Sequence, residues 1–268
     1  MEERMNRIHG PSEQSFDQVA FNRMKADALN REKGILRGYD CPKWLNKGDI
    51  VRVREDGSLV FSECGCMNLR RCVTKMERSG LKDVISDYTF DRFVVEEPWQ
   101  EAVKSGAQNY ADDPQGWLLL CGQSGSGKTH LCVAVCRKLL LEGKEVLYMP
   151  WRQELRELKA MESEGQITAI QKLQKAPVLY VDDLYKTGRA ADGSCNPTAA
   201  DVNYAFEILN YRYTNRLTTI ISTERTPEEL VKIDEATGGR MVEMARNHTF
   251  CISKKTGRNY RLRGMMVV

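Results

Sequence analysis

"LLLCGQSGSGKTHLCVAV" occupies residues 118–135 and places a burst of glycine and serine between two apolar runs. Within it, the segment from Gly122 to Thr129 matches G-x-x-x-x-G-K-[ST], the pattern of the phosphate-binding P-loop. The apolar run over 116–121 predicts a buried strand, and the run over 129–143 predicts a helix that stops at a glycine. This order of strand, loop and helix is the context in which the motif binds a nucleotide.

Each fixed residue of the motif has a physical role in binding phosphate. Glycine lets the backbone wrap closely around phosphate oxygens and aim its N–H groups at them, while the following helix offers the positive end of its dipole. Lys128 would neutralise the β- and γ-phosphates, and the hydroxyl of Thr129 would ligate Mg²⁺. We therefore expect ATP with Mg²⁺ as the ligand, bound by Gly122, Ser124, Gly125, Ser126, Gly127, Lys128 and Thr129.

A second motif supplies the acidic groups that a P-loop ATPase needs. "KAPVLYVDDL" (175–184) contains a predicted strand, Val178–Val181, followed directly by Asp182 and Asp183. Open α/β sheets bind their ligands at the carboxyl ends of strands. We expect Asp182 to hold Mg²⁺ through water and Asp183 to polarise the attacking water. An isolated Asp-Asp pair is more often a solvated turn, and its place after a P-loop favours the magnesium role.

Strand and helix patterns alternate along the rest of this region. Strands are predicted over 144–150 and 218–223, and helices over 151–165 and 198–216. In the helix over 151–165, Trp151, Leu155, Leu158 and Met161 share one face. This alternation predicts an α/β fold in which a parallel sheet carries helices on both faces.

Composition is consistent with a soluble protein of two domains, over residues 1–83 and 84–268. Hydrophobic residues make up 41% and charged residues 29%, and the net charge of +3 comes from residues 1–83, with 16 basic and 13 acidic side chains. No run approaches the ~18 apolar residues of a membrane span, and we expect a cytoplasmic location without membrane contact. The nine cysteines therefore favour reduced thiols or metal ligands over disulfides.

The order of motifs resembles the AAA+ ATPases, and among them the helicase loaders of the DnaC/DnaI type together with the related IstB transposition ATPases. The resemblance covers about residues 84–263. It is carried by "YTFDRF", the P-loop, "VDDL", "TTIISTE", "IDEATGGRM" and "NYRLR", in that order. It implies an AAA+ domain over 84–268 that hydrolyses ATP weakly and only when assembled as a homo-oligomer.

The resemblance also implies roles for residues after the acidic strand. Arg240 matches the arginine finger, which reaches the nucleotide of a neighbouring subunit and stabilises transition-state charge. Arg261 resembles the sensor-2 arginine, with Arg258 and Arg263 as competitors.

The sensor-1 position departs from the family pattern. Glu224 falls where many AAA+ proteins have asparagine, and an ionised glutamate cannot donate a hydrogen bond to the γ-phosphate. Two alternatives follow: Thr223 donates in its place, or Glu224 acts through water.

The N-terminal domain contains a predicted β-hairpin, with strands over 49–54 and 59–63 and a turn at Asp56-Gly57. A cysteine precedes the first strand and two follow the second, so strand pairing would bring three thiols together, in the layout of a zinc ribbon. These cysteines are Cys41, Cys64 and Cys66.

The fourth zinc ligand is the open question. Loaders of the DnaI kind carry Cys-x-x-Cys in the first position, whereas Trp44 replaces the second cysteine here. Cys72 is the candidate replacement, and the alternative is that Cys72 is simply buried in a helix. Because no catalytic position is evident, we expect a bound Zn²⁺ to be structural.

Two functions are compatible with these features. The first is an ATP-dependent loader that binds a hexameric replicative DNA helicase and releases it onto single-stranded DNA during replication initiation. The second is an IstB-like transposition accessory ATPase that acts on duplex DNA. The zinc-type N-terminal module favours the loader. A P-loop nucleotide-binding protein with a metal-free interaction domain is a third possibility.

Overall fold

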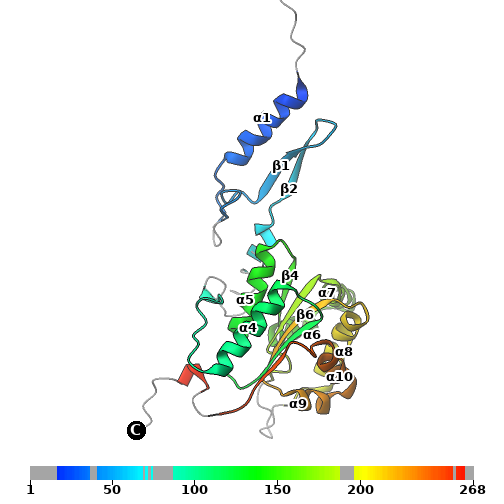
Figure 1. Ribbon diagram of the computed structural model, residues 1–268. Coiled ribbons are helices and arrows are strands. Elements are labelled where there is room, and N and C mark those ends of the chain that lie inside the picture. The colour runs from blue at the N-terminus through cyan, green and yellow to red at the C-terminus, as the bar shows by residue number, and fades with distance from the viewer. Residues whose placement is uncertain are drawn as a thin grey trace, which may run out of the picture. The chain divides into compact units, whose positions relative to one another are not determined.

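A computed structural model describes residues 17–36, 41–68, 70, 71, 74, 87–187, 196–255 and 258–262 (Figure 1). The contacts between Cα atoms divide the chain into two compact units, residues 1–64 and residues 65–268. The boundary predicted between residues 83 and 84 lies outside the described residues, and the predicted division at that point stays a prediction.

The N-terminal unit contains an antiparallel hairpin of β1 (Asp49–Val53) and β2 (Leu59–Glu63), which confirms the predicted strand pair. Its turn holds Gly57 at a φ of 80°, a conformation that favours glycine. The Asp56 carboxylate accepts hydrogen bonds from the backbone N–H (2.9 Å) and the hydroxyl (2.6 Å) of Ser58. The turn is therefore built from the Asp-Gly pair that the sequence indicates.

Helix α1 (Gln18–Arg31) packs against this hairpin. The side-chain amide of Asn30 donates to the carbonyl of Val51 (2.8 Å) and accepts from the N–H of Val51 (2.9 Å). Both backbone groups of one β1 residue are thus satisfied by the helix, which covers part of an otherwise open strand edge.

The larger unit is built on a five-stranded sheet in the order β4-β5-β6-β3-β7, and every neighbouring pair is parallel. This arrangement confirms the predicted parallel sheet. The edge strand β7 was not predicted. It has only four residues, and Ile252 alone of these is buried. The strands are β3 (Trp117–Gly122), β4 (Val146–Pro150), β5 (Val178–Asp182), β6 (Thr218–Thr223) and β7 (Thr249–Ile252).

Helices cover both faces of this sheet, as predicted (Figure 1). On one face, α5 (Lys128–Leu141) contacts the central strands and α4 (Pro98–Asp112) packs against α5. The other face shares a continuous apolar core with α6 (Trp151–Ala160), α7 (Ser163–Lys175), α8 (Ala199–Thr214), α9 (Pro227–Ile233) and α10 (Glu235–Met244). Among the described residues, no helix combines the length and apolar character needed to cross a membrane.

The single helix predicted over 151–165 is wrong, because two helices, α6 and α7, occupy this region. Met161 has an extended backbone with ψ of 150°, and its side chain is 41% exposed. It therefore does not share the buried face that Leu155 and Leu158 present. The chain turns at this point so that α7 can bury Ile170 and Leu173 in the same core.

Arg212 of α8 links three elements from inside the core, although its side chain is fully buried. Its guanidinium donates to the carbonyls of Leu173 (3.1 Å) and Ala176 (2.7 Å) at the end of α7, and to the hydroxyl of Thr219 in β6 (2.9 Å). Burial lowers the pKa of Arg212 to about 10, so the group stays charged at neutral pH. A cation is tolerated at this buried position because carbonyl and hydroxyl oxygens replace the water that would hydrate it.

Candidate active site

The loop between β3 and α5 has a backbone that only glycine adopts readily. Gly122, Gly125 and Gly127 have φ values of 104°, 71° and 89°. A Cβ atom on Gly125 would overlap Oδ1 of Asn259, and one on Gly127 would lie 2.6 Å from Cε2 of Phe93. The loop is therefore a close-fitting cradle at a helix N-terminus, which suits a phosphate group.

Lys128 is the first residue of α5 and is 6% exposed. Its ammonium donates to the carbonyls of Gly122 (2.9 Å) and Gln123 (2.7 Å). Burial lowers the pKa of Lys128, against the opposing effect of the Glu224 and Asp183 carboxylates. The loop thus holds a cation at its centre, and the predicted contact with the β- and γ-phosphates stays a prediction.

Thr129 and Asp182 come from distant parts of the sequence and meet directly. The Thr129 hydroxyl donates to Oδ1 of Asp182 across 3.1 Å. A hydroxyl and a carboxylate are the hard oxygen ligands that Mg²⁺ prefers. These two residues would therefore hold the metal, which would neutralise phosphate charge.

Three further hydroxyls donate to the Asp182 carboxylate. Tyr148 bonds Oδ2 (2.9 Å), whereas Tyr180 (2.7 Å) and Ser222 (2.5 Å) bond Oδ1. Sequence reasoning missed all three residues. Tyr180 stands two residues before Asp182 on the same strand, so both side chains point to one face of the sheet, which is the signal that could have revealed it.

Asp183 follows β5 in a left-handed conformation, with a φ of 57°. Its carboxylate accepts a hydrogen bond from the Lys186 ammonium (2.8 Å), which also lies 3.1 Å from a Glu224 oxygen. Burial raises the pKa of Asp183 and the Asp182 charge adds to this, while Lys186 opposes it. A raised pKa makes Asp183 a stronger base toward water. Lys186, three residues after Asp183, was another omission of the sequence analysis.

The two sensor-1 candidates lie in different environments. The Thr223 hydroxyl is buried and donates to the carbonyl of Leu184 (2.8 Å). Glu224 lines the pocket beside the P-loop. Burial disfavours its ionisation, but the bond to Lys186 outweighs this effect and the pKa of Glu224 is lowered. Glu224 is therefore ionised and paired at neutral pH, and the sensor role of either residue stays a prediction.

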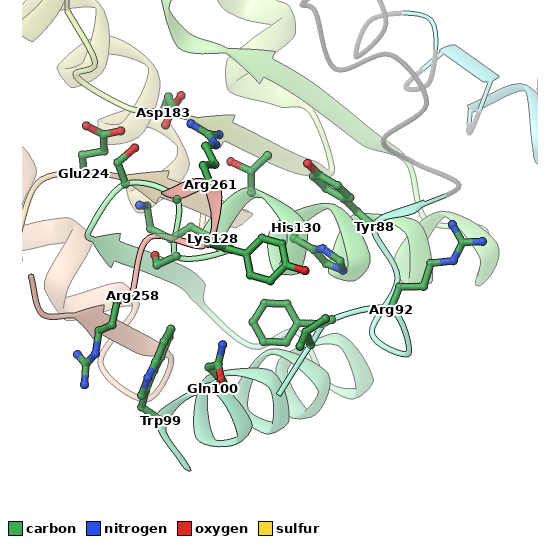
Figure 2. A pocket seen from close by; sticks show the side chains of 18 of the residues that line it. Tyr88, Arg92, Trp99, Gln100, Lys128, His130, Asp183, Glu224, Arg258 and Arg261 are labelled. Carbon is green, nitrogen blue, oxygen red and sulfur yellow. The ribbon is translucent and has the colours of Figure 1, made fainter. Parts of the chain in front are cut away.

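Aromatic residues line the pocket at the end opposite Asp183 and Glu224 (Figure 2). The rings of Tyr88 and His130 are stacked 4.5 Å apart, and Phe93 meets His130 edge-on at 5.3 Å. Nε2 of His130 donates to a backbone carbonyl (2.7 Å), and burial lowers the pKa of His130. These uncharged rings contrast with the charged P-loop end, and an aromatic ring offers a face on which a nucleotide base can stack.

Arginines near the end of the described chain complete the pocket. Arg258 stacks on Trp99, with 5.0 Å between its guanidinium carbon and the ring centroid, and bonds to the Ser253 hydroxyl (2.6 Å). Arg261 also lines the pocket and is exposed (Figure 2). Arg263 lies outside the described residues. Both described arginines thus line the same pocket as the P-loop, and the sensor-2 assignment to Arg261 stays a prediction.

Arg240, the predicted arginine finger, lies on α10 and is not among the residues that line this pocket. Its guanidinium carbon is 5.5 Å from the ring centroids of both Phe206 and Tyr213 on α8. A finger that acts on a neighbouring subunit has to lie away from its own nucleotide, so this position is compatible with the predicted role.

The N-terminal cysteines gather as the hairpin predicts. The sulfurs of Cys41, Cys64 and Cys66 all lie within 4.8 Å of one another, and all three residues are buried. The Cys41 and Cys64 sulfurs are 3.8 Å apart. Cys72, the proposed fourth ligand, lies outside the described residues. Three clustered thiols fit the ligand set of a structural Zn²⁺ site.

Comparison with known families gives one match that spans most of the chain. The profile of the family described as "IstB-like ATP binding protein" matches residues 57–262. The "Phage-like element PBSX protein XkdC" of Bacillus subtilis (strain 168) is 29% identical in an alignment of 268 positions that covers 94% of this chain and 97% of that protein.

Helicase loaders and replication initiators are more distant. The "Replicative helicase loader DnaC" of Escherichia coli (strain K12) is 26% identical over 129 residues, 45% of this chain and 51% of that protein. A solved structure, "Replication initiator DnaA bound to AMPPCP and single-stranded DNA", has a TM-score of 0.50 at 17% identity, over 65% of this chain and 52% of that one. This last similarity concerns the fold alone and agrees with the predicted AAA+ sheet.

We expect Gly125→Ala to lower ATP affinity at least tenfold. The positive φ and the overlap with Asn259 would together strain the loop, at a cost of ~1–3 kcal/mol. Isothermal titration with ATP and Mg²⁺ would measure the change. Gly143→Ala is a matched control, because Gly143 has a φ of 87° but nothing within 4 Å of an added Cβ. Unchanged affinity in Gly125→Ala would show that the loop does not form the cradle.

Proposed function

Because the chain belongs to the family of IstB-like ATP-binding proteins and is thus a P-loop ATPase, we propose that it is an ATP-dependent loader of a replicative DNA helicase. This proposal rests on one observation: the Thr129 hydroxyl, directly after the P-loop, is hydrogen-bonded to Asp182 of the acidic strand, in a chain similar over 129 residues to a replicative helicase loader. The similarity spans about half of that loader, so its partner and activity are inferences for this chain.

In this proposal the P-loop end of the pocket binds the triphosphate, and contacts with the γ-phosphate change the conformation of the chain. Lys128 neutralises phosphate charge, Thr129 and Asp182 hold Mg²⁺, and Asp183 polarises water for hydrolysis. Arg261, which also lines the pocket, would contact the γ-phosphate. A nucleotide changes the conformation only as far as its contacts differ between states, and the γ-phosphate provides that difference.

The partners would be a helicase hexamer, single-stranded DNA and further copies of this chain. The N-terminal unit is the candidate for gripping the helicase, and the ATPase unit for binding DNA. The proposed role of Arg240 would require self-assembly, because an arginine finger that lies away from its own pocket acts only on a neighbour.

We expect the chain to form a discrete complex with a cognate hexameric replicative helicase, measured as mass by light scattering after gel filtration. ATP should change the amount of this complex, and Lys128→Ala should remove that response while leaving the fold intact. Separate peaks under every condition would contradict the loader function.

The alternative is an IstB-like transposition accessory ATPase, which the description of the matching family favours. Such a protein would act on duplex DNA without a helicase. Filaments that form on duplex DNA with ATP, together with no helicase complex in the same preparation, would support this alternative over the loader.

Arg240→Ala should lower ATP hydrolysis by the assembled chain at least ~1,000-fold and leave ATP binding unchanged, because a finger acts on the transition state in another subunit. Mixing it with Lys128→Ala chains should restore activity, since these supply intact fingers. Arg216→Ala is the control: Arg216 also lies 5.5 Å from the Tyr213 ring. Full hydrolysis by Arg240→Ala, or no recovery on mixing, would contradict the assignment.

We also propose that the three-cysteine cluster binds one structural Zn²⁺ with a fourth ligand, for which Cys72 is the candidate. Cys64→Ser should reduce the zinc content, measured by elemental mass spectrometry, and lower the unfolding temperature, because zinc binding adds to folding free energy. Cys136→Ser removes a buried thiol outside the cluster and should keep the metal. Purified wild-type protein that contains no zinc would argue against the site.

A further inference from the structure

Asp182 receives hydrogen bonds from four hydroxyls, and three of them come from the sheet. We propose that Tyr148 and Tyr180 are positioning residues for this carboxylate, holding it in the orientation that binds magnesium. The inference rests on the proposed nucleotide site and assigns to it two residues for which the sequence analysis gave no role.

The two tyrosines hold the carboxylate from a rigid part of the molecule. They are register partners on the parallel strands β4 and β5, and their ring centroids lie 5.3 Å apart. Tyr148 is 1% exposed and Tyr180 is fully buried. Neither hydroxyl can turn to water, so each has a fixed direction toward Asp182, one to each carboxylate oxygen.

The fourth donor differs from the others in what it must do. Thr129 belongs to the first turn of α5, directly after the P-loop, and is itself a candidate magnesium ligand. If the Thr129 hydroxyl bound the metal, Asp182 would lose that bond and keep the three donors from the strands. The strands would therefore keep the carboxylate in place during an exchange that occurs entirely on the P-loop side.

A purely structural role for the tyrosines makes a different prediction. Buried polar groups are normally hydrogen-bonded, and the bonds could serve only the stability of the sheet. In that case, loss of a hydroxyl would lower the unfolding temperature without altering the response of nucleotide binding to magnesium. The two roles are separable, because nucleotide affinity can be measured with and without the metal.

The test is a titration of the full-length chain with a fluorescent ATP analogue, first in EDTA and then at rising Mg²⁺. Tyr180→Phe should leave the metal-free affinity within about twofold and reduce the enhancement by Mg²⁺ roughly tenfold, since bonds to a charged acceptor are the strong ones. Tyr148→Phe should act in the same direction.

Tyr185→Phe is the matched control, because Tyr185 is buried nearby and its hydroxyl has no hydrogen-bond partner among the described residues. Its magnesium response should equal that of the wild type. Wild-type enhancement in both Tyr148→Phe and Tyr180→Phe, or an equal loss in Tyr185→Phe, would overturn the inference. If the affinity of the wild-type chain for the ATP analogue does not change with Mg²⁺, the proposed nucleotide site would be overturned, and this inference with it.

Discussion

The buried carboxylate of Asp182 is the constraint on which the site depends. A charge that is 6% exposed has lost most of its water and must find donors within the protein. Four hydroxyls meet this need, from β4, β5, β6 and the first turn of α5. Because each donor comes from a different element, the carboxylate is satisfied only when the strands are in this order and the P-loop is in place.

The P-loop pocket and the predicted arginine finger lie in different places on the ATPase unit. The P-loop, Asp183 and Glu224 follow the ends of three strands and surround a single pocket, which aromatic residues close at its far end. Arg240 lies outside it, held near two rings of α8. The pocket of one chain therefore lacks Arg240, and if this residue acts as proposed, hydrolysis would require a neighbouring copy of the chain.

The N-terminal unit solves a different physical problem. A helix and one hairpin bury little apolar surface, and a small unit of this kind gains from a crosslink or a metal. Side-chain amides such as Asn30 bind the helix to the hairpin, and the cluster that contains Cys41 and Cys64 gathers beside the strand ends. The proposed zinc would thus stabilise the part of the chain that has the smallest hydrophobic core.

The sequence by itself determined the parallel sheet, the P-loop and its acidic strand, because these depend on local patterns of apolar period, glycine spacing and strand ends. It did not reveal the break after Ala160 or the strand Thr249–Ile252, where no strong local pattern marks the change. Only the tertiary structure decided that Tyr148 and Ser222 reach Asp182 and that Lys186 pairs with Glu224. Their roles arise from strands and turns that lie far apart in sequence, and a hydrogen bond between such residues leaves no spacing rule to read.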